Sequence, residues 1–179
     1  MTTTITIAPT TQQAYAALVP FVMGVTGLPA AQVLRGLQNR AAMPMPGFVL
    51  LQVIGRRRLR TNIDDVPAGD LPVTQTMEEG VELTVQIDCY GPTSLDWANM
   101  LSATLRDEYG VDQLAPLGVV PLYADEARVA PLIDEELQYE ERWSLDARFQ
   151  INPVTTVQQQ YANALELEVI SVEERFPAA

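Results

Sequence analysis

An alternation of apolar and polar residues between positions 137 and 152 constrains the fold of this chain more than any other feature. Period two with a single apolar face is typical of a β-strand that packs against a core on one side. The apolar phase consists of Leu137, Tyr139, Trp143, Leu145, Ala147, Phe149 and Ile151. Only Glu141 breaks this phase, and Pro153 ends the run. The pattern predicts one long strand that is covered on one face.

The length of this strand raises a geometrical problem. At roughly 3.4 Å per residue the strand would stretch about 50 Å. A compact domain of 179 residues has a diameter of roughly 40 Å. We therefore expect the strand to curve, to carry a bulge, for which Glu141 is the natural place, or to project beyond the body. A projecting hairpin with polar faces is one way in which ring subunits reach neighbours, and a bend inside an ordinary sheet is the alternative.

Other segments predict further strands. Residues 81–90 repeat the alternation. Residues 48–59 also indicate a strand, which is apolar on both faces up to Ile54, as in a covered strand, and then becomes basic. Residues 61–80 are polar and contain Pro and Gly, as in a long loop or an open hairpin end. Residues 155–163 indicate a turn or a short helix, and residues 165–172 indicate a last strand.

Helices are expected on one face of the sheet. Thr11 is the expected N-cap of the first, in which Pro20 should produce a kink or a restart. Another is expected to begin at Thr93 or Ser94 and to end at Gly110. The resulting fold class is α+β: a mostly antiparallel β-sheet of long amphipathic strands with helices packed on one face.

The chain divides into a flexible N-terminal arm (1–10), a single α+β domain (11–172) and a C-terminal tail (173–179). Ile5 and Ile7 alternate with Thr, so the arm could instead add a strand to a neighbour's sheet. No apolar run approaches the roughly 18 residues that cross a bilayer. The N-terminus lacks the features of a signal peptide. We expect a soluble protein that stays in the cytoplasm where it is made, with no membrane partner.

The charge balance argues against a protein that wraps nucleic acid. The net charge is −12, from 23 acidic and 11 basic residues, whereas phosphate neutralisation needs a surplus of bases. An acidic wall past which DNA slides without sticking is compatible with this balance, and so are acids that only keep the protein soluble. Every base is Arg, which suits ion pairs between subunits, although codon bias would have the same effect.

Missing residue types exclude several kinds of enzyme. The chain has no His and a single Cys89, which we expect to be a packed core thiol. It therefore lacks the nucleophile and metal sites that depend on imidazole, and no nucleotide-binding motif is present. We predict no enzyme, with no catalytic, cofactor-binding or metal-binding residues. A small hydrolase that uses two facing carboxylates is the alternative from a different class.

Charged residues on the predicted strands are candidates for a subunit interface. Arg56, Arg58 and Arg60 share one strand face, with Arg57 opposite. They could pair with acids of the next subunit, contact DNA, or form local ion pairs at a solvated strand end. The other candidates are Asp134, Glu135, Glu136, Glu140, Glu141 and Arg142. Trp97 and Trp143 are expected to be core anchors between helix and sheet, with interface hot spots as the alternative.

Several blocks of the sequence resemble one family when they are taken together. The blocks are VTGLP (25–29), VQIDCYGP (85–92), DWA (96–98), LRDEY (105–109), PLYA (121–124), YEERW (139–143) and QINPV (150–154). In this order they are similar to the phage neck-terminator family from about residue 21 to residue 172. The residues 56–60 are not part of this resemblance.

The resemblance implies a structural virion protein at the head–tail junction. Tail terminators commonly form homo-hexameric rings that cap the tail tube, stop its polymerisation and provide the surface that joins the head connector. The implied partners are copies of the chain itself, the tail tube protein, the head–tail connector or adaptor protein, and a sheath protein if the tail is contractile. DNA would pass through the lumen without sequence-specific binding. The implied location is the tail or neck of the virion, and the host cytoplasm during assembly.

Two further hypotheses remain open at this point. The chain could be another neck, connector or head-completion protein rather than the terminator itself. It could also be a small acidic module that mimics DNA to bind a host factor, although long amphipathic strands with a full core argue against this.

Overall fold

A computed structural model describes residues 5–36, 44, 46–67, 73–130, 132–133 and 139–159 of the chain. The helices of this part are α1 (Thr11–Thr26), α2 (Ser94–Leu105) and α3 (Glu108–Leu114), with short 3-10 helices at Ala30–Gln32 and Ala115–Leu117. The strands are β1 (Ile5–Ala8), β2 (Val33–Arg35), β3 (Phe48–Arg58), β4 (Ile63–Asp65), β5 (Val73–Glu78), β6 (Val81–Tyr90), β7 (Val120–Ala124), β8 (Arg128–Val129), β9 (Leu132–Ile133), β10 (Tyr139–Glu140), β11 (Arg142–Ile151) and β12 (Val154–Gln159). The predicted α+β class is confirmed.

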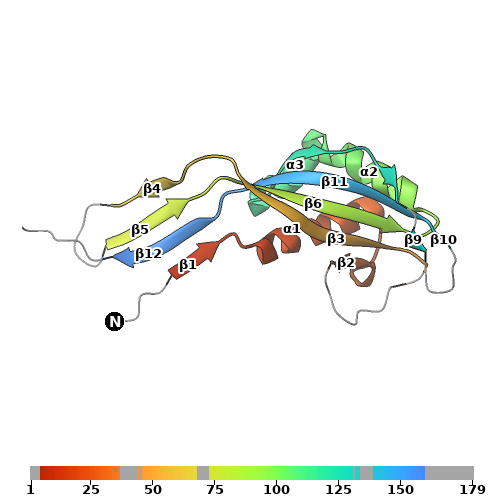
Figure 1. The fold of residues 1–179 in the computed structure, drawn as a ribbon, viewed down its shortest axis with the longest axis horizontal. Coiled ribbons are helices and arrows are strands. Elements are labelled where there is room, and N and C mark those ends of the chain that lie inside the picture. The colour runs from red at the N-terminus through yellow and green to blue at the C-terminus, as the bar shows by residue number, and fades with distance from the viewer. Residues whose placement is uncertain are drawn as a thin grey trace, which may run out of the picture.

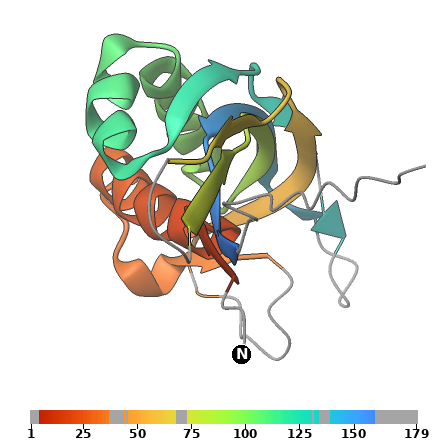
Figure 2. The same ribbon diagram turned by 90° about the vertical axis from the view of Figure 1, so that its left-hand side faces the viewer.

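The body of the protein is a mostly antiparallel sheet with helices on one face. Its six strands follow the order β2-β3-β6-β11-β7, with β8 pairing to β11. The helices α1, α2 and α3 lie on one side of this sheet (Figures 1 and 2). The odd-numbered side chains of β6, all of them buried, are Val81, Leu83, Val85, Ile87 and Cys89. The period-two alternation of residues 81–90 and of the second half of residues 137–152 is therefore confirmed as the core face of two paired strands.

Cys89 belongs to this core as a free, fully buried thiol. Burial, and then the nearby charge of Asp88, raise the pKa of Cys89 to about 12. The thiolate is the reactive form of cysteine. The thiol is therefore protonated and unreactive in the folded protein, as expected for a core residue.

The long alternating segment is divided at Glu141. Strand β10 pairs with β9, whereas β11 pairs with β6, β7 and β8. The backbone N–H of Gly91 donates to the carbonyl of Glu141 at 3.0 Å, between the two strands. The break lies at the residue that interrupts the apolar phase, and the register of β11 restarts at Arg142. At its C-terminal end β11 continues into β12, and this part of the chain leaves the body.

A second sheet, which we call the projecting sheet, extends from one end of the body (Figure 1). It has the order β1-β12-β5-β4, and all its neighbours are antiparallel. Three chain segments cross from one sheet to the other at a narrow waist formed by residues 59–62, 79–80 and 152–153. The crossing segments are still joined there by hydrogen bonds from Leu59 N to Gly80 O (2.8 Å) and from Glu79 N to Pro153 O (3.0 Å). The alternating segment is therefore interrupted at Glu141, and the chain that follows it also projects beyond the body.

The projecting sheet contains several departures from the sequence-based expectations. Residues 154–159 form strand β12 rather than a turn or short helix, because Val154, Thr155, Thr156 and Val157 favour extended backbone and pair with strands on both sides. Ile5–Ala8 pairs with β12 of its own chain instead of standing apart as an arm. The expected strand at 165–172 and the tail at 173–179 lie outside the described residues.

The helices also differ from expectation at three positions. Thr10, not Thr11, caps α1 through a reciprocal pair of hydrogen bonds with Gln13. Pro20 lies inside α1, which continues as one helix because its apolar face is packed on the core. Gly110 does not end the helix of α2 but lies within α3. A side chain there would come within 2.5 Å of the Thr104 carbonyl oxygen, so the glycine permits α3 to pack on the end of α2.

Candidate assembly surface

The predicted arginine cluster lies at the waist and is paired within its own chain. The carboxylate of Glu79 binds Arg56 Nη2 at 2.6 Å and Arg58 Nε at 2.9 Å. Arg57, on the opposite strand face, binds Glu82 Oε2 at 2.9 Å, and Arg60 pairs with Glu78. Each arginine therefore has a carboxylate partner close to the point where the two sheets join.

These partners differ from the acids that were suggested from the sequence. Glu78, Glu79 and Glu82 belong to the β5–β6 segment, which the register of β3 on β6 brings alongside the arginines. Asp134, Glu135 and Glu136 lie outside the described residues, and only the backbone of Glu140 is described, in β10. Glu141 is exposed and accepts a hydrogen bond from Trp143 Nε1 at 3.1 Å. The interface role of these acids stays a prediction.

The waist ion pairs are expected to orient the projecting sheet more than to stabilise the fold. The paired arginines are at least one-third exposed, and exposed pairs of this kind contribute about 0–1 kcal/mol each. Through Arg56 and Arg58, Glu79 nevertheless ties the end of β3 to the turn that joins β5 and β6, and Arg60 binds Glu78 at the end of β5. A rotation of the projecting sheet about the waist would have to break several of them together.

Acidification should weaken this connection in a defined pH range. Hydrogen bonds from Arg58 and Arg56 hold the pKa of the Glu79 carboxyl below its ordinary value of 4.5. Because the folded-state pKa is depressed, the stabilisation is fully present above pH 4.5 and is lost as the pH falls through the folded-state pKa. Glu79→Gln should therefore lower the free energy of unfolding by less than about 1 kcal/mol near neutral pH. Urea unfolding of both proteins should show this difference shrinking in acid, and a difference that grows in acid would contradict the assignment.

Arg142 forms an ion pair inside the body rather than on the projecting sheet. Its Nη2 lies 2.8 Å from Asp88 Oδ2, and the Asp88 side chain is only 3% exposed. The guanidinium also lies 5.5 Å from the centre of the Tyr90 ring. Gln86 Nε2 donates to both Asp88 oxygens, at 3.0 and 3.1 Å. Arg142 therefore contacts β6 of its own chain on the sheet face opposite the core.

The two tryptophans lie at the margin of the core. Trp97 in α2 and Trp143 in β11 are half-buried and pack against the buried apolar cluster. A Cβ added at Gly47 would come within 2.7 Å of the Tyr90 carbonyl oxygen and 3.0 Å of the Trp97 ring, so this position has no room for a side chain. The roles of the two tryptophans as core anchors between helix and sheet, or as interface hot spots, stay predictions.

The projecting sheet is uncovered on both faces in the described part of the chain. None of the side chains described on its four strands is buried, and Ile5 and Ile7 are 64% and 51% exposed. Paired residues of antiparallel strands point to the same face, so Ile5 and Val157 lie on one face together with Ile7 and Met77. Such a sheet has no core of its own, and an apolar sheet face normally packs against another layer.

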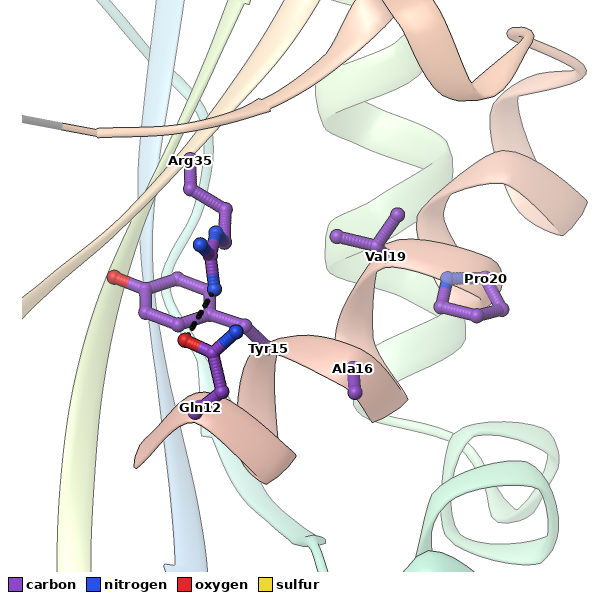
Figure 3. Close-up of a pocket in the computed structure, with 6 residues that line it drawn as sticks. All are labelled: Gln12, Tyr15, Ala16, Val19, Pro20 and Arg35. Atoms are coloured by element: carbon purple, nitrogen blue, oxygen red, sulfur yellow. Dashed lines mark hydrogen bonds between the residues drawn. The ribbon is translucent and has the colours of Figure 1, made fainter. Parts of the chain in front are cut away.

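A groove beside α1 offers a second surface for contact. It has a volume of about 280 Å³ and is lined by Gln12, Tyr15, Ala16, Val19, Pro20 and Arg35. Figure 3 shows the Arg35 side chain next to the Tyr15 ring, with Arg35 Nη1 hydrogen-bonded to Gln12 Oε1 at 2.7 Å. The groove adjoins β2, which is the edge strand of the body sheet. The sequence analysis missed this site. No local sequence pattern indicates that β2 lies at a sheet edge or that it lies beside α1.

A helix-covered body and a projecting sheet without a buried side chain among those described define an α+β protein whose prominent surfaces suit contact with other protein chains. The sequence model of the phage neck terminator proteins matches residues 12–174. The chain therefore belongs to the phage neck terminator protein family. It is a structural protein of the head–tail junction, in the tail and neck of the virion, and not an enzyme. Among curated proteins, none matched the chain. None of the helices in the described ranges is long and apolar enough to cross a membrane.

Proposed function

We propose that this chain forms a closed ring of six copies that caps the tail tube and presents the surface to which the head connector attaches. The observation that carries the proposal is the projecting sheet, which has no buried side chain among those described. An element that leaves its own body and docks on the next copy makes a heterologous contact, and such contacts generate rings when the rotation closes. Membership of the phage neck terminator family supports a position at the neck.

The proposed ring lets DNA pass through its lumen without sequence-specific binding. The net charge of −12 repels phosphate rather than binding it. The waist arginines do not alter this, because each already has a carboxylate partner. The proposed partners are the tail tube protein, the head–tail connector or adaptor protein, and a sheath protein if the tail is contractile. Arg56, Arg58 and Arg60 would assist assembly by holding the projecting sheet at its angle.

Removing the chain from an infecting phage distinguishes a terminator from other neck proteins. A terminator stops polymerisation of the tube, so its loss should produce tails longer than normal that are not joined to heads. Electron microscopy of lysates would measure tail length, and purified chain added back should restore capping. Tails of normal length that fail to join heads would instead support the alternative of a connector or head-completion protein.

A further inference from the structure

The groove beside α1 holds the guanidinium of Arg35 next to a strand edge that is unpaired among the described strands. Arg35 is the last residue of β2. Its guanidinium lies 5.3 Å from the centre of the Tyr15 ring and donates to Gln12. Tyr15 is itself held in place, because its hydroxyl accepts a hydrogen bond from Val53 N at 2.8 Å. No carboxylate pairs with Arg35 in the part of the chain that the structure describes.

The features of this groove define the kind of segment that would fit it. No other described strand pairs with the outer edge of β2, so this edge offers backbone hydrogen bonds to an added strand. The apolar lining beyond Tyr15, formed by Ala16, Val19 and Pro20, suits an apolar side chain. The guanidinium has donors left for a carboxylate, which it binds more strongly than a neutral acceptor. The expected occupant is a short extended segment with an apolar residue followed by an acid.

Strand β4 at the edge of the projecting sheet has this composition. It consists of Ile63, Asp64 and Asp65, all exposed, and Ile63 is 56% exposed. Neither aspartate has an ion-pair partner among the described residues. The outer edge of β4 is open in the described sheet, and β4 has the same length as β2. The other edge strand, β1, has no acidic residue.

We propose that β4 of one subunit pairs in parallel with β2 of the next, with Asp65 against Arg35 and Ile63 over the groove. Parallel alignment places the acid at the end of β2 where Arg35 lies. Side chains alternate along a strand, so Ile63 and Asp65 then share the face that contains the groove. Within one chain the two strands belong to different sheets, one in the projecting sheet and one at the edge of the body (Figure 1).

This inference rests on the proposed ring and specifies its subunit contact. The contact joins two different surfaces of the same chain, so each subunit would use β4 on one side and β2 on the other. That is the heterologous geometry that a ring requires. The acid and the cation would also select the alignment, because a strand shifted by one residue would turn Asp65 away from the groove.

A charge exchange tests the contact directly. Arg35→Glu and Asp65→Arg should each weaken self-association at least about tenfold, because each places like charges together. The combined variant should recover assembly, since it restores an opposite pair. Sedimentation and light scattering, with and without tail tubes, would measure the oligomer. Asp112→Arg and Arg148→Glu make the same changes at exposed positions away from the contact and should leave assembly unaltered.

A disulfide link supplies a second readout. Cys89 is buried, so an Arg35→Cys/Asp65→Cys variant would carry only two accessible thiols. Oxidation should produce a ladder of covalent oligomers on a non-reducing gel, and its highest band would report the number of subunits. The matched pair Arg35→Cys/Asp112→Cys should produce no ladder.

The outcomes separate the strand pairing from the ring itself. If the wild-type chain assembles while every charge variant assembles equally and no ladder forms, the pairing of β4 with β2 is wrong and the ring stands. If both single variants fail and the combined variant does not recover, the pairing is also wrong. A wild-type chain that neither self-associates nor caps tail tubes would overturn the ring.

Discussion

Replacing Arg142 with methionine should lower the free energy of unfolding by about 3 kcal/mol, because it leaves the Asp88 carboxylate buried without its cation. Asp88 is 3% exposed, and Arg142 is the charged group that pairs with it. Gln86 would still donate to Asp88, but a neutral amide offsets only part of the lost attraction. The expected cost lies at the low end for buried pairs because Arg142 itself remains 22% exposed. Urea unfolding near neutral pH would measure it.

The double variant Arg142→Met/Asp88→Asn provides the control for this prediction. Removing both charges leaves no buried ion, so the double variant should be more stable than Arg142→Met alone. Arg128→Met is a matched single change: Arg128 is 56% exposed and its partner Asp146 is 19% exposed, against 3% for Asp88, so this pair should contribute only about 0–1 kcal/mol. If Arg142→Met costs no more than Arg128→Met, the burial of Asp88 does not have the consequence assigned to it.

Replacing Phe149 with alanine should lower the free energy of unfolding by about 3–5 kcal/mol. Phe149 is 1% exposed and lies in the middle of the body sheet, opposite Leu83 of β6 and Pro121 of β7. The loss combines the transfer free energy of the ring with a cavity that the two flanking strands cannot fill without losing register. Thermal and urea unfolding should both show the loss.

An exposed apolar residue on the adjacent strand provides the comparison for Phe149. Leu122 of β7 is 45% exposed, so Leu122→Ala should change stability by no more than about 0.5 kcal/mol. Equal effects of the two substitutions would contradict the placement of the core between β6, β11 and the helices.

The regular elements of the body were predictable because their signals are local. Alternation along residues 81–90 and 142–151 follows from the two-residue repeat of a strand, and it indicates which face meets the core without any knowledge of the partner. The interruption at Glu141 was also visible as a single charged residue in an apolar phase. Helix boundaries were harder to place. Gly110 was expected to end a helix, but its role is to allow two helices to come close together.

The candidate assembly surface was predictable only in part. The arginines at 56–60 and the alternation of Ile5 and Ile7 are evident in the sequence, whereas the partners of both are not. Arg56 and Glu79 are 23 residues apart, and only the register of the β3–β6 pair brings them together. No sequence pattern indicated Arg35 or Asp65 as contact residues, because the proposed role of each depends only on its position in an edge strand of the described sheets.

Composition, periodicity and motif order by themselves determined that the chain has a covered sheet, contains no imidazole chemistry and belongs to a family of structural neck proteins. These properties depend on residue types and on their spacing over short stretches of sequence, and both can be read from the sequence directly. Only the tertiary structure decided that the long strands leave the body as a second sheet, and which of the described charges have an ion-pair partner. Those depend on strand register and on solvent exposure, and both arise from contacts between residues that are distant in sequence.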